Sequence, residues 1–412
     1  MCSASSSGRE TSLLIVTQYY HPDVTAAAFR IKETADLLAG KGYEVTVITA
    51  RPHRGIAEGE SAAPLDDGAV KVIRVPLVPY SGKGKWNYIA HYSSFMMNAL
   101  MAALRLKGRP SVVLATSPPL FAGWAGLLTA RLKGAKFFLD VRDLWPESAV
   151  SAGQLSQSGI LFRGAKVAER LLYGGAVKIS AVSRPMAERI GGIMGAPGSE
   201  KLFVMYNGVP SSYLPEAGKE PEASSRDFTV SYVGNFGRCQ NLEVVVEAAA
   251  LLEKEGHSGI DFRLIGDGVE RRKLEAMALE RGLKRFAIEG PVGKAEAFRE
   301  MAQASALVLP LLSDETMART IPSKVFDYMC AGKPVIYGIK GEGAEILSRT
   351  GGNLAFIPDD PPSLSEAIRK VKEEHEAFSL RASGNAREVA QSYTREKMAD
   401  LLDEKIREVL GR

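Results

Sequence analysis

The sequence predicts an α/β protein with two doubly wound domains, each a parallel sheet covered by helices on both faces. Short β-branched runs alternate with helical patterns along the whole chain. A chain of 412 residues is too long for one compact core and is expected to form two domains of roughly 150–200 residues. The β-pattern restarts after YNGVPSSYLPEAGKEPEASSRD, which is rich in Pro, Ser and Glu and is therefore the best candidate linker.

The first domain is predicted over residues 11–206. Its strand candidates, in chain order, are SLLIVTQYY, EVTVITA, VKVIRVPL, SVVLATS, KFFLDVRD and VKISAVS. A helix is expected over residues 26–41, between the first two of them. Parallel strands need crossover connections, so the helical patterns between the strands are expected to pack on the faces of one sheet.

The second domain is predicted over residues 207–392, with helices over 242–255, 269–281 and 295–304. Its strand candidates are FTVSYVGN, DFRLIGDG, RFAIEG, ALVLPLL, KPVIYG and LAFIP. After them, Thr394 to Leu410 has the pattern of a long amphipathic helix with no strand behind it. We expect residues 393–412 to pack back on the first domain.

The composition is typical of a globular chain, with 45% hydrophobic and 24% charged residues. The three cysteines, Cys2, Cys239 and Cys330, have no metal-binding spacing and fit a reducing cytosol. No apolar run reaches the ~18 residues of a membrane span, and the Ser-rich start lacks the apolar core of a signal peptide. These features predict a cytoplasmic protein.

The net charge of +4 is unevenly distributed. Residues 1–206 hold 24 Lys and Arg against 15 Asp and Glu, whereas residues 207–412 hold 28 against 33. The difference is either ordinary scatter or a sign that the first half faces something anionic, such as a membrane surface or a phosphorylated substrate. Nucleic acid is not expected, because no binding motif or basic–aromatic stripe accompanies the charge.

Ligands of open α/β sheets bind beyond the carboxyl ends of the strands, so the strand-to-helix loops are the candidate sites. In VSYVGNFGRCQNLEVVVEAA, the amides of a glycine turn, with Arg238 and Gln240 nearby, suit a diphosphate at a helix start. The loop Gly266-Asp267-Gly268 suits a nucleotide. Taken alone, each loop is also explained as an ordinary turn, and the second as a helix cap.

The most specific candidate is TIPSKVFDYMCAGKPVIYG, from Thr320 to Gly338. Pro322 suits a helix start. A lysine in the first turn, Lys324, opposes the helix dipole unless an anion lies in front of it, and Asp327 lies on the same face. We interpret the pair as a cation for phosphate and a carboxylate for sugar hydroxyls. The alternative is an intrahelical ion pair on a solvated face.

Together these segments resemble a known family. The order NGV, GNFG, GDG, EGPV and PSKVFDYMCAGKPVI resembles the C-terminal half of the retaining glycosyltransferases of family 4, which have the GT-B fold. QYYHPDVTAAAFRIKETADLLAGKGYEVTVITARP resembles their first βαβ unit, and DVRDLWPESAVSAG resembles bacterial surface-polysaccharide transferases that include the L-fucosamine transferases. The resemblance runs from about Leu13 to Leu410.

The resemblance implies transfer of a sugar, with retained anomeric configuration and without a cofactor or a required metal. The C-terminal domain would hold a nucleotide-sugar donor, a UDP-sugar by similarity to the subgroup, and the N-terminal domain an acceptor saccharide, commonly carried on a lipid. By position, Asp327 would hold ribose hydroxyls and Ser323 and Lys324 the phosphates, while Arg142 and Asp143 would lie near the sugar. Further donor-side residues would be Gly234, Asn235, Phe236, Gly237, Arg238, Asp267, Gly268 and, at the base pocket, Val292.

Three places depart from the family pattern. The first glutamate of the family's E-x7-E motif falls at Arg319, which is no carboxylate. The basic residue usual after the glycine loop is replaced by Gln240, with Arg238 two residues earlier. On the acceptor side, the Gly-Gly of the first loop is replaced by Thr25 and Ala26, so close backbone approach to a phosphate is less expected there.

Negative charge develops on the leaving diphosphate and would be met by Lys324, by a second basic residue such as Arg238, and by helix-start amides. A front-face displacement needs no protein nucleophile; Asp143 acting as a base is the alternative. Rival functions are a sugar-nucleotide epimerase, which needs carboxylates for acid–base work, and a non-catalytic sugar-nucleotide-binding subunit. A Rossmann dehydrogenase is not expected, because no G-x-G-x-x-G follows the first strand.

The segment from Ser81 to Arg109 has an amphipathic pattern with basic flanks. Its apolar positions are Trp86, Ile89, Phe95, Met96, Ala99, Leu100 and Ala103, and its basic ones Lys83, Lys85, Arg105, Lys107 and Arg109. One interpretation is a core helix with solvated ends. The other is an interfacial face that binds an anionic membrane peripherally and brings the enzyme to a lipid-linked acceptor at the inner leaflet.

Overall fold

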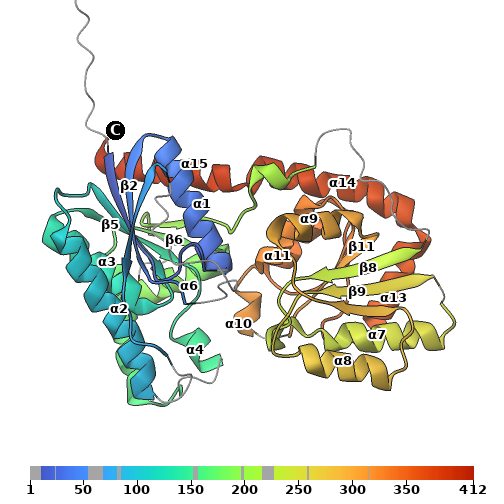
Figure 1. Ribbon diagram of the computed structural model, residues 1–412. Coiled ribbons are helices and arrows are strands. Elements are labelled where there is room, and N and C mark those ends of the chain that lie inside the picture. Colours follow the sequence, from blue (N-terminus) through green and yellow to red (C-terminus); the bar gives the residue numbers. More distant parts are fainter. Residues whose placement is uncertain are drawn as a thin grey trace, which may run out of the picture. The chain divides into compact units, whose positions relative to one another are not determined.

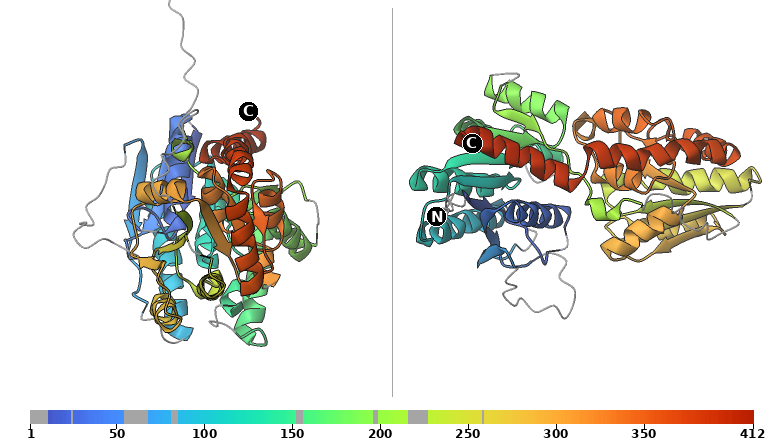
Figure 2. Two further views of the ribbon diagram at one scale, coloured as in Figure 1. Left: turned by 90° about the vertical axis from the view of Figure 1, so that its right-hand side faces the viewer. Right: turned by 90° about the horizontal axis from the view of Figure 1, so that it is seen from above.

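The computed structural model describes residues 11–23, 25–53, 68–80, 85–151, 156–195, 199–215, 227–257, 259–313 and 315–412. The chain divides into two compact units (Figure 1). The N-terminal unit comprises Met1–Tyr206 together with Met398–Arg412, and the C-terminal unit comprises Asn207–Lys397. Each unit contains one parallel sheet with helices on both faces (Figures 1 and 2), which confirms the predicted fold class.

The described part of the N-terminal unit has a seven-stranded sheet in the order β3-β2-β1-β4-β5-β6-β7. Every neighbouring pair is parallel. Six of the strands were predicted, and the short β7 was missed. The strands are β1 (Thr11–Val16), β2 (Tyr43–Ala50), β3 (Val70–Val75), β4 (Val112–Ser117), β5 (Lys136–Val141), β6 (Lys178–Ala181) and β7 (Leu202–Val204).

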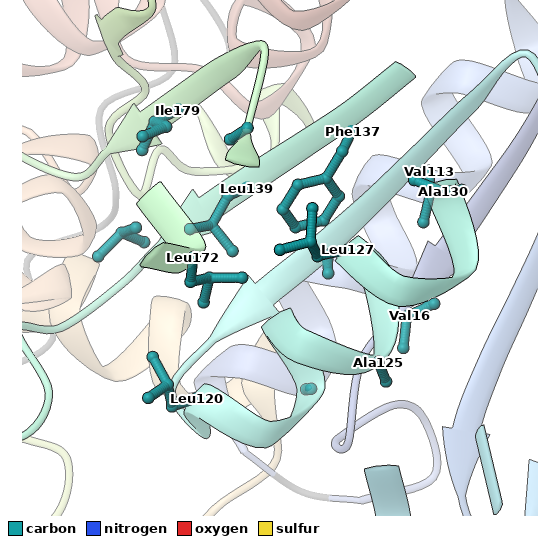
Figure 3. Close-up of a cluster of buried hydrophobic side chains, with 14 of the residues drawn as sticks. Val16, Val113, Leu120, Ala125, Leu127, Ala130, Phe137, Leu139, Leu172 and Ile179 are labelled. Atoms are coloured by element: carbon teal, nitrogen blue, oxygen red, sulfur yellow. The ribbon is translucent and has the colours of Figure 1, made fainter. Parts of the chain in front are cut away.

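Four long helices share one apolar core with this sheet: α2 (Lys85–Arg105), α3 (Leu120–Lys133), α5 (Ile160–Gly175) and α6 (Arg184–Met194). Figure 3 shows part of this core, where Leu127 and Ala130 of α3 lie against Phe137 and Val113 of the strands. A short helix, α4 (Glu147–Ser151), follows β5. The core residues of α3 and of the strands are buried because these elements are apolar almost throughout, as expected of a parallel sheet covered on both faces.

The second core of the N-terminal unit contains residues from both ends of the described chain. It joins α1 (Ala26–Gly40) to α15 (Arg395–Leu410): Leu402 and Ile406 of α15 are fully buried and belong to the same apolar cluster as Leu13 and Ile31. Polar contacts fix the same helix to the unit. Tyr43 Oη donates to Asp403 at 2.6 Å, Lys178 Nζ to Glu408 at 2.6 Å and Lys41 Nζ to Asp400 at 2.5 Å.

The described part of the C-terminal unit has a six-stranded sheet in the order β10-β9-β8-β11-β12-β13. The strands are β8 (Phe228–Val233), β9 (Ile260–Ile265), β10 (Phe286–Glu289), β11 (Ala306–Pro310), β12 (Val335–Gly338) and β13 (Leu354–Ala355). All six follow the predicted strand segments. The helices are α7 (Glu243–Lys254), α8 (Arg271–Glu280), α9 (Lys294–Gln303), α10 (Glu315–Ala318), α11 (Ser323–Cys330), α12 (Glu342–Ser348), α13 (Pro361–Glu373) and α14 (His375–Ser392).

The apolar face predicted on α2 is mostly a core face. Phe95, Ala99 and Ala103 are at most 1% exposed and pack against the sheet, so the interfacial interpretation of these three residues is wrong. The outer side of α2 instead exposes Met97 and Met101, with Leu104 beside them. Lys83 and the side chains of Lys85 and Trp86 lie outside the described residues.

Candidate functional site

The glycine loop at the end of β8 is fixed by a buried tyrosine and by a lysine side chain. Tyr328 Oη accepts from the backbone N–H of Val233 at 2.9 Å and donates to its carbonyl at 3.1 Å. The next residue, Gly234, has φ +150°, and a Cβ there would lie 2.2 Å from Lys324 Cε. The backbone conformation therefore favours glycine at this position, and a methyl group there would also displace the end of the Lys324 side chain.

Lys324 is the cation that faces this loop. It lies in the first turn of α11, with Nζ 3.4 Å from Gln240 Oε1 and 5.3 Å from the ring centroid of Tyr232. Burial lowers the pKa of Lys324, and the negative charge of Asp327 partly offsets this effect. A partly buried lysine at a helix N-terminus, beside a glycine loop, is an arrangement that favours an anion.

The loop after β9 packs backbone to backbone on the glycine loop. Gly266 has φ +150°, and a Cβ there would lie 1.9 Å from the carbonyl oxygen of Gly234. The N–H of Phe236 donates to the carbonyl of Asp267 at 2.8 Å, and the Asp267 carboxylate accepts from the N–H of Gly268 at 2.9 Å. The structure thus brings the two predicted donor loops together, over a fully buried Phe236.

The other predicted donor residues lie around these loops at different depths. Ser323 begins α11 and is partly buried, as is Asp327 one turn later. Val292 follows β10 and is 40% exposed. Arg238 points into solvent: its side chain is 85% exposed, and its Nε lies 3.4 Å from the carboxylate of Glu270.

In the N-terminal unit, Arg142 joins a buried charge network that the sequence analysis missed. Asp140, inside β5, is 1% exposed and accepts from Arg30 at 3.1 Å and from Ser180 Oγ at 2.7 Å. Arg142 Nη1 lies 3.8 Å from the same carboxylate. The only available signal in the sequence was a charged residue inside the apolar run KFFLDV.

Asp143 belongs to a different environment from that of its neighbour Arg142. Burial raises the pKa of the Asp143 carboxyl, and hydrogen bonds from Ser148 and the N–H of Leu144 lower it in part.

On the predicted acceptor side, Thr25 caps α1 by accepting from the N–H of Ala28 at 3.1 Å. Ala26 begins that helix and is exposed.

The described residues contain no group of three or more His, Cys, Asp and Glu side chains that could hold a metal ion. Within the same residues, no helix is long and apolar enough to cross a membrane.

Comparison with known proteins identifies both units. Residues 25–208 match the glycosyl transferase 4-like domain, and residues 227–374 match the domain of glycosyl transferases group 1. WcaI of Escherichia coli (strain K12), named for glycosyl transfer in colanic acid biosynthesis, is 27% identical over an alignment of 342 residues that covers 78% of this chain and 81% of WcaI.

Two solved structures show the same fold. Sucrose-phosphate synthase from Thermosynechococcus elongatus superposes with a TM-score of 0.76 at 16% identity, covering 98% of this chain and 100% of that one. Anabaena HepE, solved in complex with UDP and glucose, gives a TM-score of 0.69 at 15% identity, covering 96% and 99%. The chain is therefore a glycosyltransferase with the GT-B fold. Its N-terminal unit matches a glycosyl transferase 4-like domain, and its C-terminal unit matches a domain of glycosyl transferases group 1.

Proposed function

We propose that the protein is a retaining glycosyltransferase that moves a sugar from a UDP-sugar to a saccharide acceptor in bacterial surface-polysaccharide assembly. The observation that supports it best is the partly buried Lys324 against the Gly234 loop, which suits a diphosphate. The similarity to WcaI supports the polysaccharide context, and HepE is a GT-B protein that binds UDP and glucose.

In this proposal the C-terminal unit binds the donor, and Asp327 accepts hydrogen bonds from ribose hydroxyls. Lys324 and the amides at the start of α11 stabilise the negative charge that develops on the leaving diphosphate. The acceptor oxygen forms its bond to the anomeric carbon on the face that the diphosphate leaves, and the acceptor proton passes to the departing phosphate oxygen. From the N-terminal unit, Arg142 and Asp143 are proposed to bind the transferred sugar, as the resemblance to the family implies.

Nucleotide binding tests the donor half of the proposal. UDP is expected to raise the melting temperature more than GDP does. Lys324→Ala and Asp327→Ala should each weaken UDP binding by about ten- to a hundred-fold, because each removes a charge-assisted contact. Lys273→Ala removes an exposed lysine of α8 and serves as the matched control. Stabilisation by GDP alone would exclude a UDP-sugar donor, and unchanged UDP binding in either site variant would exclude that residue's role.

Product analysis tests the reaction itself. With donor and acceptor, NMR of the product should show the anomeric configuration of the donor sugar. An inverted product would contradict the retaining mechanism, and a C2-epimerised nucleotide sugar without any transfer would identify an epimerase instead. Activity is expected to survive a chelator, because the proposed charge stabilisation uses Lys324 and backbone amides.

We also propose a lipid-linked acceptor and peripheral membrane binding, through a surface different from the apolar positions first considered on α2. The outer sides of α2, α3 and α5 expose large apolar side chains: Met97, Met101, Leu104, Leu132, Ile160, Leu161, Val167 and Leu171. The sequences of these three helices contain a single carboxylate, Glu169, which is buried. The exposed charges among them include Arg105, Arg131, Arg163 and Arg170. Apolar groups among cations suit an anionic lipid surface.

Vesicle co-sedimentation tests this surface. Binding to anionic vesicles is expected to fall at high salt and to weaken in the double variant Arg163→Glu with Arg170→Glu, because each basic residue contributes about 1 kcal/mol near such a surface. The double variant Lys273→Glu with Arg281→Glu in the C-terminal unit is the control. Equal binding to neutral and anionic vesicles would exclude the electrostatic contribution.

A further inference from the structure

Three polar side chains meet beyond the carboxyl ends of β1 and β2 in the N-terminal unit. Gln18 follows β1, His53 follows β2, and His91 lies in α2. Gln18 Nε2 lies 3.0 Å from His91 Nε2, and the His53 and His91 ring centroids are 5.8 Å apart. Tyr19 and Tyr80 border the group, with centroids 5.4 Å from His53 and 5.8 Å from His91, respectively. None of these residues belongs to the predicted site.

The hydrogen bonds of His91 fix the orientation of Gln18. His91 is 4% exposed, and its Nδ1 lies 2.6 Å from the carbonyl oxygen of Val78. A carbonyl can only accept, so Nδ1 carries the ring hydrogen and, in the neutral imidazole, Nε2 is an acceptor. The group of Gln18 that contacts Nε2 is therefore the NH2 donor, as the structure places it, and Gln18 Oε1 points elsewhere.

Two buried hydrogen-bond acceptors, one on Gln18 and one on His53, are left without a donor among the residues that the structure describes. Gln18 is fully buried, and within the described part of the chain its Oε1 has no hydrogen-bond partner. The same reasoning applies to His53, whose Nδ1 lies 3.0 Å from the carbonyl oxygen of Arg51 and so carries the hydrogen. In the neutral ring its Nε2 is then an acceptor, and it too is buried without a partner among the described residues. Buried acceptors of this kind are rare unless a ligand or water donates to them.

We propose that Gln18 Oε1 and His53 Nε2 accept hydrogen bonds from hydroxyl groups of an acceptor sugar ring. Two neutral acceptors suit a ligand that is rich in O–H donors, and they disfavour a phosphate, which would place further acceptors against them. Tyr19 and Tyr80 add aromatic faces on which the apolar side of a pyranose can pack. The inference rests on the proposed function and names the chemistry by which the N-terminal unit recognises its acceptor.

The first experiment needs no ligand. Long-range 1H–15N NMR of the full chain at neutral pH should show the Nδ1–H tautomer for both His53 and His91. An Nε2–H tautomer at His53 would remove the second acceptor and overturn the proposal.

The second experiment measures glycoside binding by saturation-transfer NMR in the presence of UDP. The probes are the methyl glycosides of glucose, galactose, mannose, fucose and N-acetylglucosamine. At least one is expected to bind, and Gln18→Leu should weaken it about tenfold. Asn98→Leu is the matched control, because Asn98 is also an amide in this unit and its NH2 group donates to the carbonyl of Pro76 at 2.8 Å. Failure of every probe, or equal binding by Gln18→Leu, would overturn the proposal.

A third measurement remains decisive if Gln18→Leu does not fold. Monodeoxy derivatives of the bound glycoside should include at least one that binds the unaltered protein about tenfold more weakly, and no such loss in the series would exclude hydroxyl recognition. UDP thermal shifts, run in parallel, separate the two proposals. Absence of a UDP shift would contradict the proposed function, whereas a normal UDP shift without glycoside recognition would contradict only this inference.

Discussion

Gly234 and Lys324 constrain each other at the candidate donor site. We predict that Gly234→Ala lowers UDP affinity at least tenfold, because the added methyl group would lie 2.2 Å from Lys324 Cε and displace the lysine, and an L-residue is strained at this φ. Isothermal titration with UDP measures the effect. Gly384→Ala is the control, since that glycine lies inside α14 with space for a methyl group. Unchanged affinity in Gly234→Ala would show that the loop does not hold the nucleotide.

The lowered pKa of Lys324 predicts a pH dependence. The folded protein binds this proton less tightly than the unfolded chain, so the contribution of Lys324 to stability becomes more favourable as the pH rises toward the ordinary value of 10.5. UDP requires the protonated form, so its affinity should fall over the same alkaline range. Titrations at increasing pH should show this fall in the unaltered protein but not in Lys324→Met. An equal slope in both would assign the effect to another group.

Contacts between residues that lie far apart in the sequence could not be predicted from the sequence alone. The loops at Gly234 and Gly266 were found because glycine after a strand has a local conformational signature. The Arg30–Asp140 and Gln18–His91 contacts join residues 110 and 73 positions apart, and only the folded sheet brings them together. Lys324 and Asp327 were singled out because both lie on one short helix, where spacing alone determines the face.

At the scale of elements, most strands were predictable because they are short runs rich in apolar, β-branched or aromatic residues. β7 has only three residues, all of them partly exposed, and offered too little pattern. The two sides of α2 were harder to assign. Helical periodicity identifies an apolar face but does not say whether a sheet or a lipid surface covers it.

The assignment of the α2 faces has a direct test. We predict that Phe95→Ala lowers the free energy of unfolding by about 3–5 kcal/mol, because Phe95 is fully buried in the core. Met97→Ala, on the exposed side of the same helix, should change it by less than about 0.5 kcal/mol. Urea denaturation measures both, and similar losses in the two variants would contradict the assignment.

At the scale of the whole molecule, the two-unit plan followed from length, alternation and the linker, but the buried side of α15 had to be seen in the structure. We predict that Leu402→Ala destabilises the N-terminal unit by about 2–5 kcal/mol, because Leu402 is fully buried beside Ile406. Glu404→Ala, an exposed position of the same helix, is the control. Tryptophan fluorescence in urea measures both, since all three tryptophans, Trp86, Trp124 and Trp145, lie in residues 1–206. A small effect of Leu402→Ala would mean that the core closes without α15.

The position of α15 also has a consequence for synthesis on the ribosome. Residues 1–206 emerge first, but the apolar cluster that contains Leu13 and Ile31 is completed only after residues 207–397 have been translated and Leu402 has followed them. At 5–20 residues per second this interval is roughly 10–40 s. During it, the nascent chain presents an uncovered apolar patch, which suits the binding of a chaperone. The first unit to be translated is thus the last to complete its core. The C-terminal unit can already be folded before α15 has been translated and has packed on the N-terminal unit.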